Sequence, residues 1–89
     1  MLIKTVSDFR KAMRETKNIY PGGYEFVFHA SGGGHLCRKC VKQNAARVVL
    51  ALALRDEQDI WYLYGSESTS QMEGPVICDE CDKILLDVD

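Results

Sequence analysis

Four cysteines form two pairs with the same spacing, Cys37-x-x-Cys40 and Cys78-x-x-Cys81, and 37 residues separate the two pairs. A C-x-x-C turn points both of its sulfur atoms at one place, and two such turns brought together make a tetrahedral site with Zn–S distances of about 2.3 Å. Because no cysteine is left over, the pattern predicts one zinc ion per chain, bound by all four cysteines. Four thiolates fill the coordination sphere, so the predicted role of the metal is structural rather than catalytic.

Two other uses of four cysteines remain open at this point. Two disulfide bonds would require an oxidising compartment, but residues 1–4 begin no extended apolar segment of the kind found in secretory signals. The chain is therefore predicted to be cytoplasmic. Four thiolates also suit a rubredoxin-like iron centre. Rubredoxin turns usually carry glycine after the second cysteine, whereas Val41 and Asp82 stand there in this chain, so zinc is the favoured metal.

Each of the two histidines could replace a cysteine as a metal ligand. His35 lies two residues before Cys37 and is the better placed of the two. Because four cysteines already complete a zinc site, we expect His35 to lie beside the site or at the surface. His29 alternates with aromatic residues in a strand pattern, so we expect it to be a hydrogen-bonded strand residue.

The chain is short enough to need a staple. Its 89 residues, of 10.0 kDa, allow one domain, residues 1–89, with an N-terminal helix in 1–19 and a zinc-centred core in 20–86. A domain this small buries only about 60–65% of its unfolded surface, so its core is marginal without a cross-link. The longest apolar run, residues 48–54, is far shorter than the roughly 20 residues of a membrane span, so we predict no membrane contact.

Hydrophobic spacing predicts the elements that must position the first cysteine pair. Residues 6–17 show the pattern of an amphipathic helix, and Thr5 precedes Asp8 by three residues, as in a capping box. A Tyr-Pro-Gly-Gly-Tyr turn follows at 20–24. Residues 24–30 alternate like a strand, and the glycine-rich turn at 31–34 returns the chain to the cysteines, which predicts a β-hairpin.

The second half of the chain predicts one more helix and a second hairpin. Residues 41–55 favour a helix, because fifteen residues without glycine or proline exceed a typical strand. Nine of the ten residues in 45–54 are apolar, so we expect this helix to be largely buried. Residues 60–64 predict a strand and 65–74 a loop, and the segments 75–77 and 83–86 flank the second cysteine pair. The predicted fold is α+β, with two helices and short antiparallel strands around one zinc ion.

Three motifs are similar to those of small proteins encoded by bacteriophages and prophages. These motifs are the aromatic-Pro-Gly-Gly-aromatic turn at 20–24 and the two cysteine pairs, which follow Leu36 and Ile77. Over most of residues 20–85, the order of turns, strands, helix and cysteine pairs resembles that of zinc-ribbon or treble-clef-related domains. The resemblance implies a mobile-element origin and a zinc site, and it implies no substrate. This chain departs from the pattern in the acidic residues around its second pair and in its Ser-rich loop.

The net charge of −2 conceals a strong asymmetry along the chain. Residues 1–55 carry ten Lys and Arg against three Asp and Glu, whereas residues 56–89 carry one Lys against ten Asp and Glu. Such a distribution suggests a basic face for an anionic partner. We favour the alternative that the two halves fold against each other and largely cancel, because both signs lie within about one Debye length in so small a domain.

The sequence contains no recognised catalytic pattern. Zinc deaminases need H-x-E before their C-x-x-C, and neither His29 nor His35 is followed by glutamate at that spacing. The patterns H-E-x-x-H and G-x-S-x-G are also missing. A redox role for Cys37 would need a free thiol. A zinc ion bound jointly with the second cysteine pair would occupy that thiol. We therefore predict that the protein is not an enzyme and has no small-molecule substrate.

The favoured function is a non-enzymatic, zinc-stapled interaction or adaptor domain. Small zinc domains often present a sheet edge or an apolar helix face to a protein partner or to a second copy. The alternative is a nucleic-acid-binding domain that contacts phosphates. Its basic residues would be Lys11, Arg14, Lys17, Arg38, Lys39, Lys42 and Arg47. The pI of about 5.6 argues against tight binding to nucleic acid, because affinity comes mainly from phosphate neutralisation.

Overall fold

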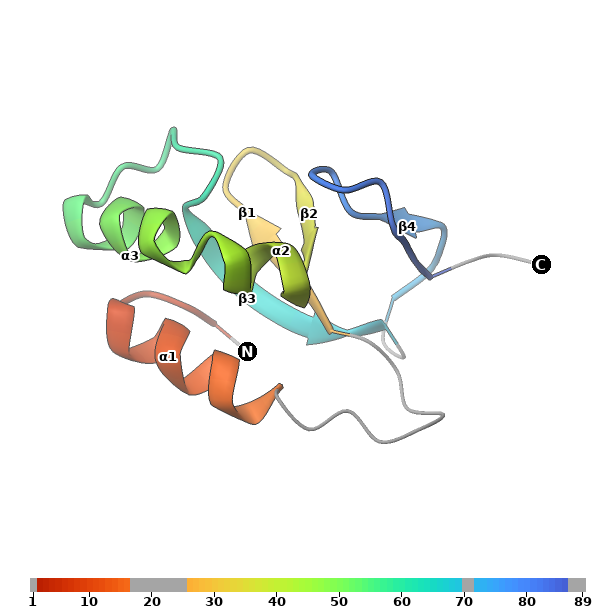
Figure 1. Ribbon diagram of the computed structural model, residues 1–89, viewed down its shortest axis with the longest axis horizontal. Coiled ribbons are helices and arrows are strands. Elements are labelled where there is room, and N and C mark those ends of the chain that lie inside the picture. The colour runs from red at the N-terminus through yellow and green to blue at the C-terminus, as the bar shows by residue number, and fades with distance from the viewer. Residues whose placement is uncertain (1, 17–25, 70–71, 87–89) are drawn as a thin grey trace.

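The computed structural model describes residues 2–16, 26–69 and 72–86, and these residues adopt an α+β fold (Figure 1). In chain order their elements are α1 (Val6–Glu15), β1 (Phe26–Ala30), β2 (His35–Cys37), α2 (Arg38–Gln43), α3 (Ala45–Leu54), β3 (Leu63–Ser68), β4 (Val76–Ile77) and β5 (Ile84–Leu86). Their strand pairs are antiparallel, as predicted. The described residues form three helices, however, where the sequence predicted two.

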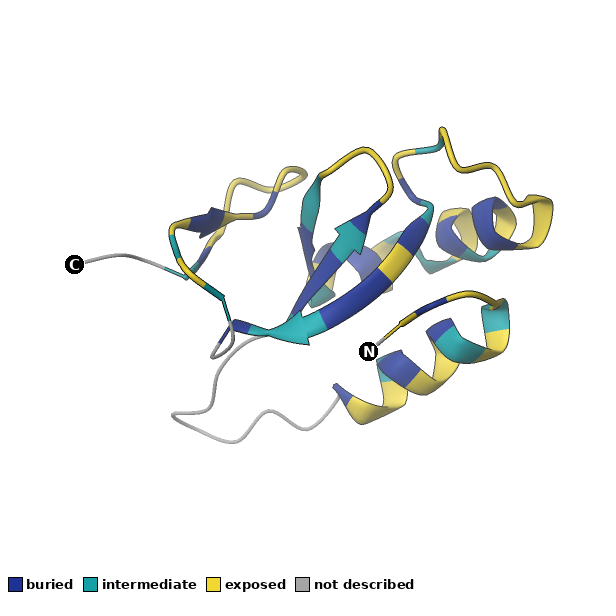
Figure 2. Ribbon diagram, turned by 180° about the vertical axis from the view of Figure 1, so that it is seen from behind, coloured by how far each residue is buried: buried dark blue, intermediate teal, exposed yellow. Residues whose placement is uncertain are grey.

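Strand β1 is the centre of a three-stranded sheet with the order β2-β1-β3. Val27 lies opposite Cys37 in β2, and Phe28 lies opposite Ser66 in β3. Helices α2 and α3 cover one face of this sheet, as the two opposite views show (Figures 1 and 2). Strands β4 and β5 form a separate two-stranded sheet beside β2. The β1–β2 and β4–β5 hairpins are the two that the sequence predicted. One cysteine pair begins at the end of β2, and the other lies in the turn between β4 and β5.

Helix α1 begins with the predicted capping box. The Thr5 hydroxyl accepts a hydrogen bond from the Asp8 amide at 3.1 Å, and the Asp8 carboxylate accepts one from the Thr5 amide at 3.2 Å. These two bonds satisfy backbone donors that a helix start leaves without partners. Phe9 and Ala12 bury the inner face of the helix. Residue 17, the predicted helix end, and residues 24–25 of the predicted strand lie outside the described residues.

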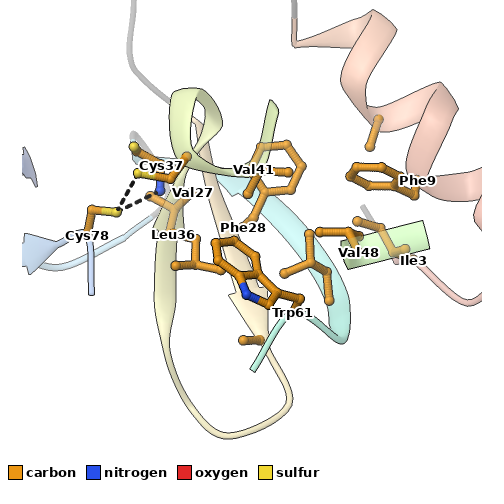
Figure 3. Packing of buried hydrophobic residues seen from close by; sticks show 14 of the residues in the cluster. Ile3, Phe9, Val27, Phe28, Leu36, Cys37, Val41, Val48, Trp61 and Cys78 are labelled. Atoms are coloured by element: carbon orange, nitrogen blue, oxygen red, sulfur yellow. Dashed lines mark hydrogen bonds between the residues drawn. The ribbon is translucent and has the colours of Figure 1, made fainter. Parts of the chain in front are cut away.

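The hydrophobic core lies between the sheet and the helices (Figure 3). Phe28 of β1 and Val48 of α3 are fully buried, and the Trp61 ring packs with them. Burying each large apolar side chain contributes about 1.5–3 kcal/mol. The core therefore uses Trp61 for packing, which is typical of an aromatic residue in the half-buried strand predicted for 60–64, although β3 begins only at Leu63.

The helix predicted for residues 41–55 is instead two helices. Helix α2 begins earlier, at Arg38, because Cys37 is extended (φ −79°, ψ 157°) and serves as its N-cap residue. Asn44 then separates α2 from α3, with φ −114° and ψ 25°. The Asn44 side chain donates to the Cys40 carbonyl at 2.9 Å, and such local bonds compete with helical backbone bonds. The apolar pattern carries no sign of this side-chain bond, so the break was missed.

The expectation that this stretch is largely buried is also wrong. Val48, Ala51 and Leu52 of α3 are buried, but Leu50 is 59% exposed and Leu54 is 68% exposed. Only one side of α3 faces the sheet, because no second layer covers it in the described residues (Figure 1). No helix among the described residues is both long and apolar enough to cross a membrane.

The third strand lies later in the chain than predicted, at 63–68 rather than 60–64. Asp59 holds the residues just before this strand in a turn. Its carboxylate accepts a hydrogen bond from the Trp61 amide at 2.9 Å, and its carbonyl accepts one from the Tyr62 amide at 3.0 Å. Ser66 and Ser68 then pair with β1, although serine is typical of loops. Pairing with a central strand overrides such propensities, so the predicted loop 65–74 is strand in its first part.

Candidate metal centre

The structure brings the four cysteine sulfurs into one cluster. The sulfur atoms of Cys37, Cys40, Cys78 and Cys81 all lie within 4.8 Å of one another. The Cys37–Cys81 distance is 3.7 Å and the Cys40–Cys78 distance is 3.8 Å. Four sulfurs at about 2.3 Å from a central zinc ion would lie about 3.8 Å apart at the corners of a regular tetrahedron. A disulfide bond would need about 2.05 Å, so this cluster has the dimensions of a metal site.

The first pair sits where a strand meets a helix. Cys37 ends β2 and is the N-cap residue of α2, and Cys40 lies in the first turn of that helix. The backbone amide of Cys40 donates to the Cys37 sulfur. The amides of a helix start carry partial positive charge, which stabilises thiolates placed there. The sequence predicted a helix beginning at residue 41, whereas α2 begins three residues earlier, at Arg38.

The second pair sits in the turn between β4 and β5. The Cys78 amide donates to the Lys83 carbonyl at 2.8 Å, and the Asp82 amide donates to the Cys78 carbonyl at 2.9 Å. Asp82 has a φ of 62°, which is the left-handed region that favours glycine. Asp82 therefore occupies the position after the second cysteine with the backbone that glycine usually supplies there.

The electrostatic surroundings of the sulfurs differ. Burial opposes ionisation of Cys78, but backbone amides of Cys37, Cys81 and Glu80 donate to its sulfur and together lower its pKa to about 7. The Cys37 amide makes this contact at 3.3 Å (Figure 3). Burial raises the pKa of the Cys37 and Cys40 thiols. A metal ion bound here would therefore have to displace protons from Cys37 and Cys40 at neutral pH.

A pair of hydrogen bonds joins the two turns outside the sulfur cluster. The Asp79 carboxylate accepts from the His35 amide at 2.7 Å, and the Asp79 amide donates to the His35 carbonyl at 2.8 Å. These bonds fix the second turn against β2, so the two cysteine pairs are held face to face by protein contacts as well. No local sequence pattern singles out Asp79, because its contact with His35 spans 44 residues.

Neither histidine belongs to the sulfur cluster in the described residues. His29 lies 2.8 Å from a Glu67 carboxylate oxygen through its Nε2 atom, and its ring stacks on Tyr64 with centroids 5.9 Å apart. The His35 ring meets the His29 ring edge to face at 5.3 Å. His29 is thus a partnered strand histidine, as expected, and His35 lies beside the metal centre through its backbone rather than as a ligand.

The basic residues named for nucleic-acid binding are divided between different surroundings. Five of them are exposed: Lys11, Arg14, Lys39, Lys42 and Arg47. Arg38 is half-buried, since its guanidinium donates to the Thr16 hydroxyl at 2.9 Å and to the Met13 carbonyl at 2.8 Å, and residue 17 lies outside the described part. Arg10, which the sequence analysis left out, lies with Arg14, Arg38 and Lys42 along one groove. Its spacing of four residues from Arg14 was the signal for it.

Comparisons with known proteins identify no relative of this chain. The chain matches no protein-family model, no curated protein and no solved structure. Its function is therefore inferred from its own residues.

Proposed function

We propose that the protein is a non-enzymatic interaction domain whose fold is held by one structural zinc ion bound to Cys37, Cys40, Cys78 and Cys81. The observation that carries the proposal is the sulfur geometry, with separations of 3.7 and 3.8 Å that match a tetrahedral zinc site. Zinc is preferred to iron on the evidence of the first turn, where Val41 stands in place of the glycine of a rubredoxin, whereas Asp82 in the second turn adopts a glycine-like backbone. Four thiolates leave no open position for a reacting water molecule, which supports a structural role.

Energetics support the same role. A structural zinc ion contributes about 10–16 kcal/mol of apparent binding free energy, whereas whole domains unfold at about 5–15 kcal/mol. A chain of 89 residues lies at the small end of that range. The metal would therefore supply most of the stability, and we place the protein with the zinc-ribbon or treble-clef-related domains as part of the proposal.

Cys81 offers the sharpest test, because it is the exposed member of the cluster. Substituting an exposed residue usually changes stability by less than about 0.5 kcal/mol, so a large effect of Cys81→Ser can come only from a lost metal ligand. The neighbouring exposed residue gives the matched control, Glu80→Ser. We expect one zinc ion per chain in protein purified without added metal, by elemental analysis, and loss of cooperative melting in Cys81→Ser alone. Wild-type melting by Cys81→Ser, or a folded metal-free chain, would contradict the proposal.

Nucleic-acid binding remains the alternative, and one observation favours it. No Lys or Arg side chain of residues 2–16 and 26–55 forms an ion pair within the described residues, so contacts with the acidic second half do not occupy these side chains. Affinity for DNA or RNA would then fall steeply with salt, because each neutralised phosphate releases counterions. Lys39 and Lys42 are the residues to reverse, since Arg38 holds α1 in place. We expect negligible binding near physiological salt; submicromolar binding that Lys39→Glu/Lys42→Glu abolishes would establish the alternative.

A further inference from the structure

An open groove runs between α1 and the α2–α3 layer, with a volume of about 560 Å³. The two helices α1 and α3 lie side by side and run in opposite directions (Figure 1). The floor of the groove is apolar, and its rim is basic. Phe9, Met13 and Val49 form the floor, and Arg10, Arg14 and Lys42 stand at the rim. The groove thus combines an apolar floor with positive charge at its edges.

Among the described residues, no carboxylate lines this groove. The two acidic residues of α1, Asp8 and Glu15, lie on the opposite side of the helix by its 3.6-residue repeat. The acidic second cysteine turn packs against the first cysteine turn and against β2, and none of its described residues lines the groove. The groove therefore presents one sign of charge to an incoming partner, and its positive rim residues form no ion pairs within the described residues.

The apolar surface continues from the groove along α3. Ala46 lines the groove, and Leu50 and Leu54 follow it at four-residue intervals, which places the three on one side of the helix. Leu50 and Leu54 remain 59% and 68% exposed. Large apolar side chains exposed in a row beside an apolar groove are typical of a surface that another molecule covers.

We propose that this groove and the adjoining face of α3 bind an amphipathic helix of a partner protein whose flanks carry Asp and Glu. This inference rests on the proposed function as an interaction domain and names the chemistry of its partner. An amphipathic helix places apolar side chains at i, i+3, i+4 and i+7, a spacing that fits along two antiparallel helices. Its acidic flanks would meet Arg10, Arg14 and Lys42, which are exposed and positioned along the rim.

Other occupants fit the groove less well. A second copy packed groove to groove would bring two basic rims together, and like charges across an interface oppose association. A nucleic acid would contact the rim through phosphates but leave Leu50 and Leu54 exposed to water. A small molecule would remain largely in solvent, because Arg10, Arg14, Lys42 and Ala46 are all exposed, whereas binding pockets bury about 70–90% of a ligand.

The test uses zinc-loaded protein and a synthetic peptide of about 18 residues, long enough to form several helical turns. The peptide carries Leu at i, i+3, i+4 and i+7 spacing and Glu on both flanks, with a fluorophore at one end. Three controls are a peptide with the same residues in scrambled order, a peptide with Lys in place of Glu, and a single-stranded DNA of similar length. Fluorescence anisotropy measures binding at several salt concentrations.

Two neighbouring residues of α1 provide matched variants. Arg10 lines the groove, whereas Lys11 is exposed on the other side of the helix. Arg10→Glu and Lys11→Glu change the net charge equally, so only a local contact can separate them. We expect Arg10→Glu to weaken binding of the acidic peptide at least about fivefold and Lys11→Glu to change it less than about twofold. Ala46→Glu, which adds a charge to the apolar side, should abolish binding while the protein keeps its zinc and its melting profile.

Each outcome decides the inference. Binding of the acidic peptide about tenfold tighter than that of the scrambled and Lys-containing peptides supports it. Equal effects of Arg10→Glu and Lys11→Glu, no binding at a peptide excess, or preference for the DNA would overturn it. A wild-type dimer in sedimentation that Ala46→Glu dissociates would also overturn it, in favour of a second copy. Zinc content and melting are measured on the same samples, so failure of the groove inference stays distinct from failure of the zinc proposal.

Discussion

Gly34 approaches Asp79 so closely that a Cβ added to residue 34 would lie 3.0 Å from the Asp79 Oδ2 atom. The same Oδ2 atom accepts the hydrogen bond from the His35 amide at 2.7 Å. An alanine at residue 34 would therefore crowd the Asp79 carboxylate, which would have to move by a few tenths of an ångström while it holds the second cysteine turn against β2. The glycine in this position serves the metal centre by leaving room for a bond made by another residue.

Gly34→Ala should lower the free energy of unfolding by about 1 kcal/mol, because the Asp79 carboxylate must move and its hydrogen bond is lost. Gly32→Ala is the control, since a Cβ there meets nothing within 4 Å. Urea unfolding of zinc-loaded protein measures both. In an Asp79→Ala background, Gly34→Ala should cost nothing further, because the pair is then already broken. Additive effects of the two substitutions would contradict this explanation.

Arg38 links the first cysteine turn to the end of α1, through its bonds to Met13 and Thr16. Arg38→Met should lower the free energy of unfolding by about 1.5–3 kcal/mol, the range for hydrogen bonds to charged groups. Arg38→Lys should not restore stability, because an ammonium cannot donate from two positions of a planar group. Lys39→Met, at the exposed neighbour, should stay within about 0.5 kcal/mol of wild type. Equal losses in the free energy of unfolding for Arg38→Met and Lys39→Met would contradict this structural role of Arg38.

Asp82 adopts a left-handed backbone with φ 62°. Left-handed residues other than glycine cost about 1–2 kcal/mol, less for Asp and Asn. Asp82→Gly should therefore raise the free energy of unfolding by up to about 1 kcal/mol, and Asp82→Val should lower it. Asp82→Asn separates the effect of the charge from that of the backbone, because asparagine also tolerates a left-handed backbone but carries no charge. Glu80→Gly, two residues earlier, should bring no gain in thermal melting; a gain equal to that of Asp82→Gly would count against the explanation.

Zinc affinity should fall as the pH falls, because protons compete with the metal for thiolates. Burial raises the pKa of Cys37 and Cys40, so both must lose protons on binding near neutral pH. Cys78 has a pKa of about 7, because its backbone donors outweigh its burial. Above that pH it is already a thiolate; below it, one more proton competes and the logarithm of affinity should fall about one unit more steeply per pH unit. Competition with a chromophoric chelator measures this slope, and an unchanged slope across pH 7 would contradict the assignment to Cys78.

Local signals made the cysteine pairs and the start of α1 predictable. Spacing within C-x-x-C and between Thr5 and Asp8 involves neighbours in sequence, and the structure keeps both. The helix break was missed because it depends on the side chain of one residue, Asn44. Strand β3 was predicted too early in the chain because serine is typical of loops. Ser66 belongs to a strand only through its pairing with β1.

Contacts between distant residues could not be predicted from one sequence. Nothing near Asp79 in the sequence signals that its carboxylate reaches His35. Arg10 and Lys11 are adjacent and alike in charge, yet only Arg10 lines the groove. The apolar stretch containing Leu50 resembles a buried helix, since composition does not reveal how many layers cover it.

The contact between Cys37 and Cys78 spans 41 residues. A metal ion joining them would act as a cross-link, and by the chain-entropy model a loop of that size removes about 4 kcal/mol of conformational freedom from the unfolded chain. The β1–β2 hairpin and α2 involve near neighbours and can form early, whereas the second cysteine turn must search across the intervening chain. An ion held first by Cys37 and Cys40 would shorten that search on each encounter. Docking of the second cysteine turn should therefore follow formation of the β1–β2 hairpin and α2, because its contacts join residues far apart in the sequence.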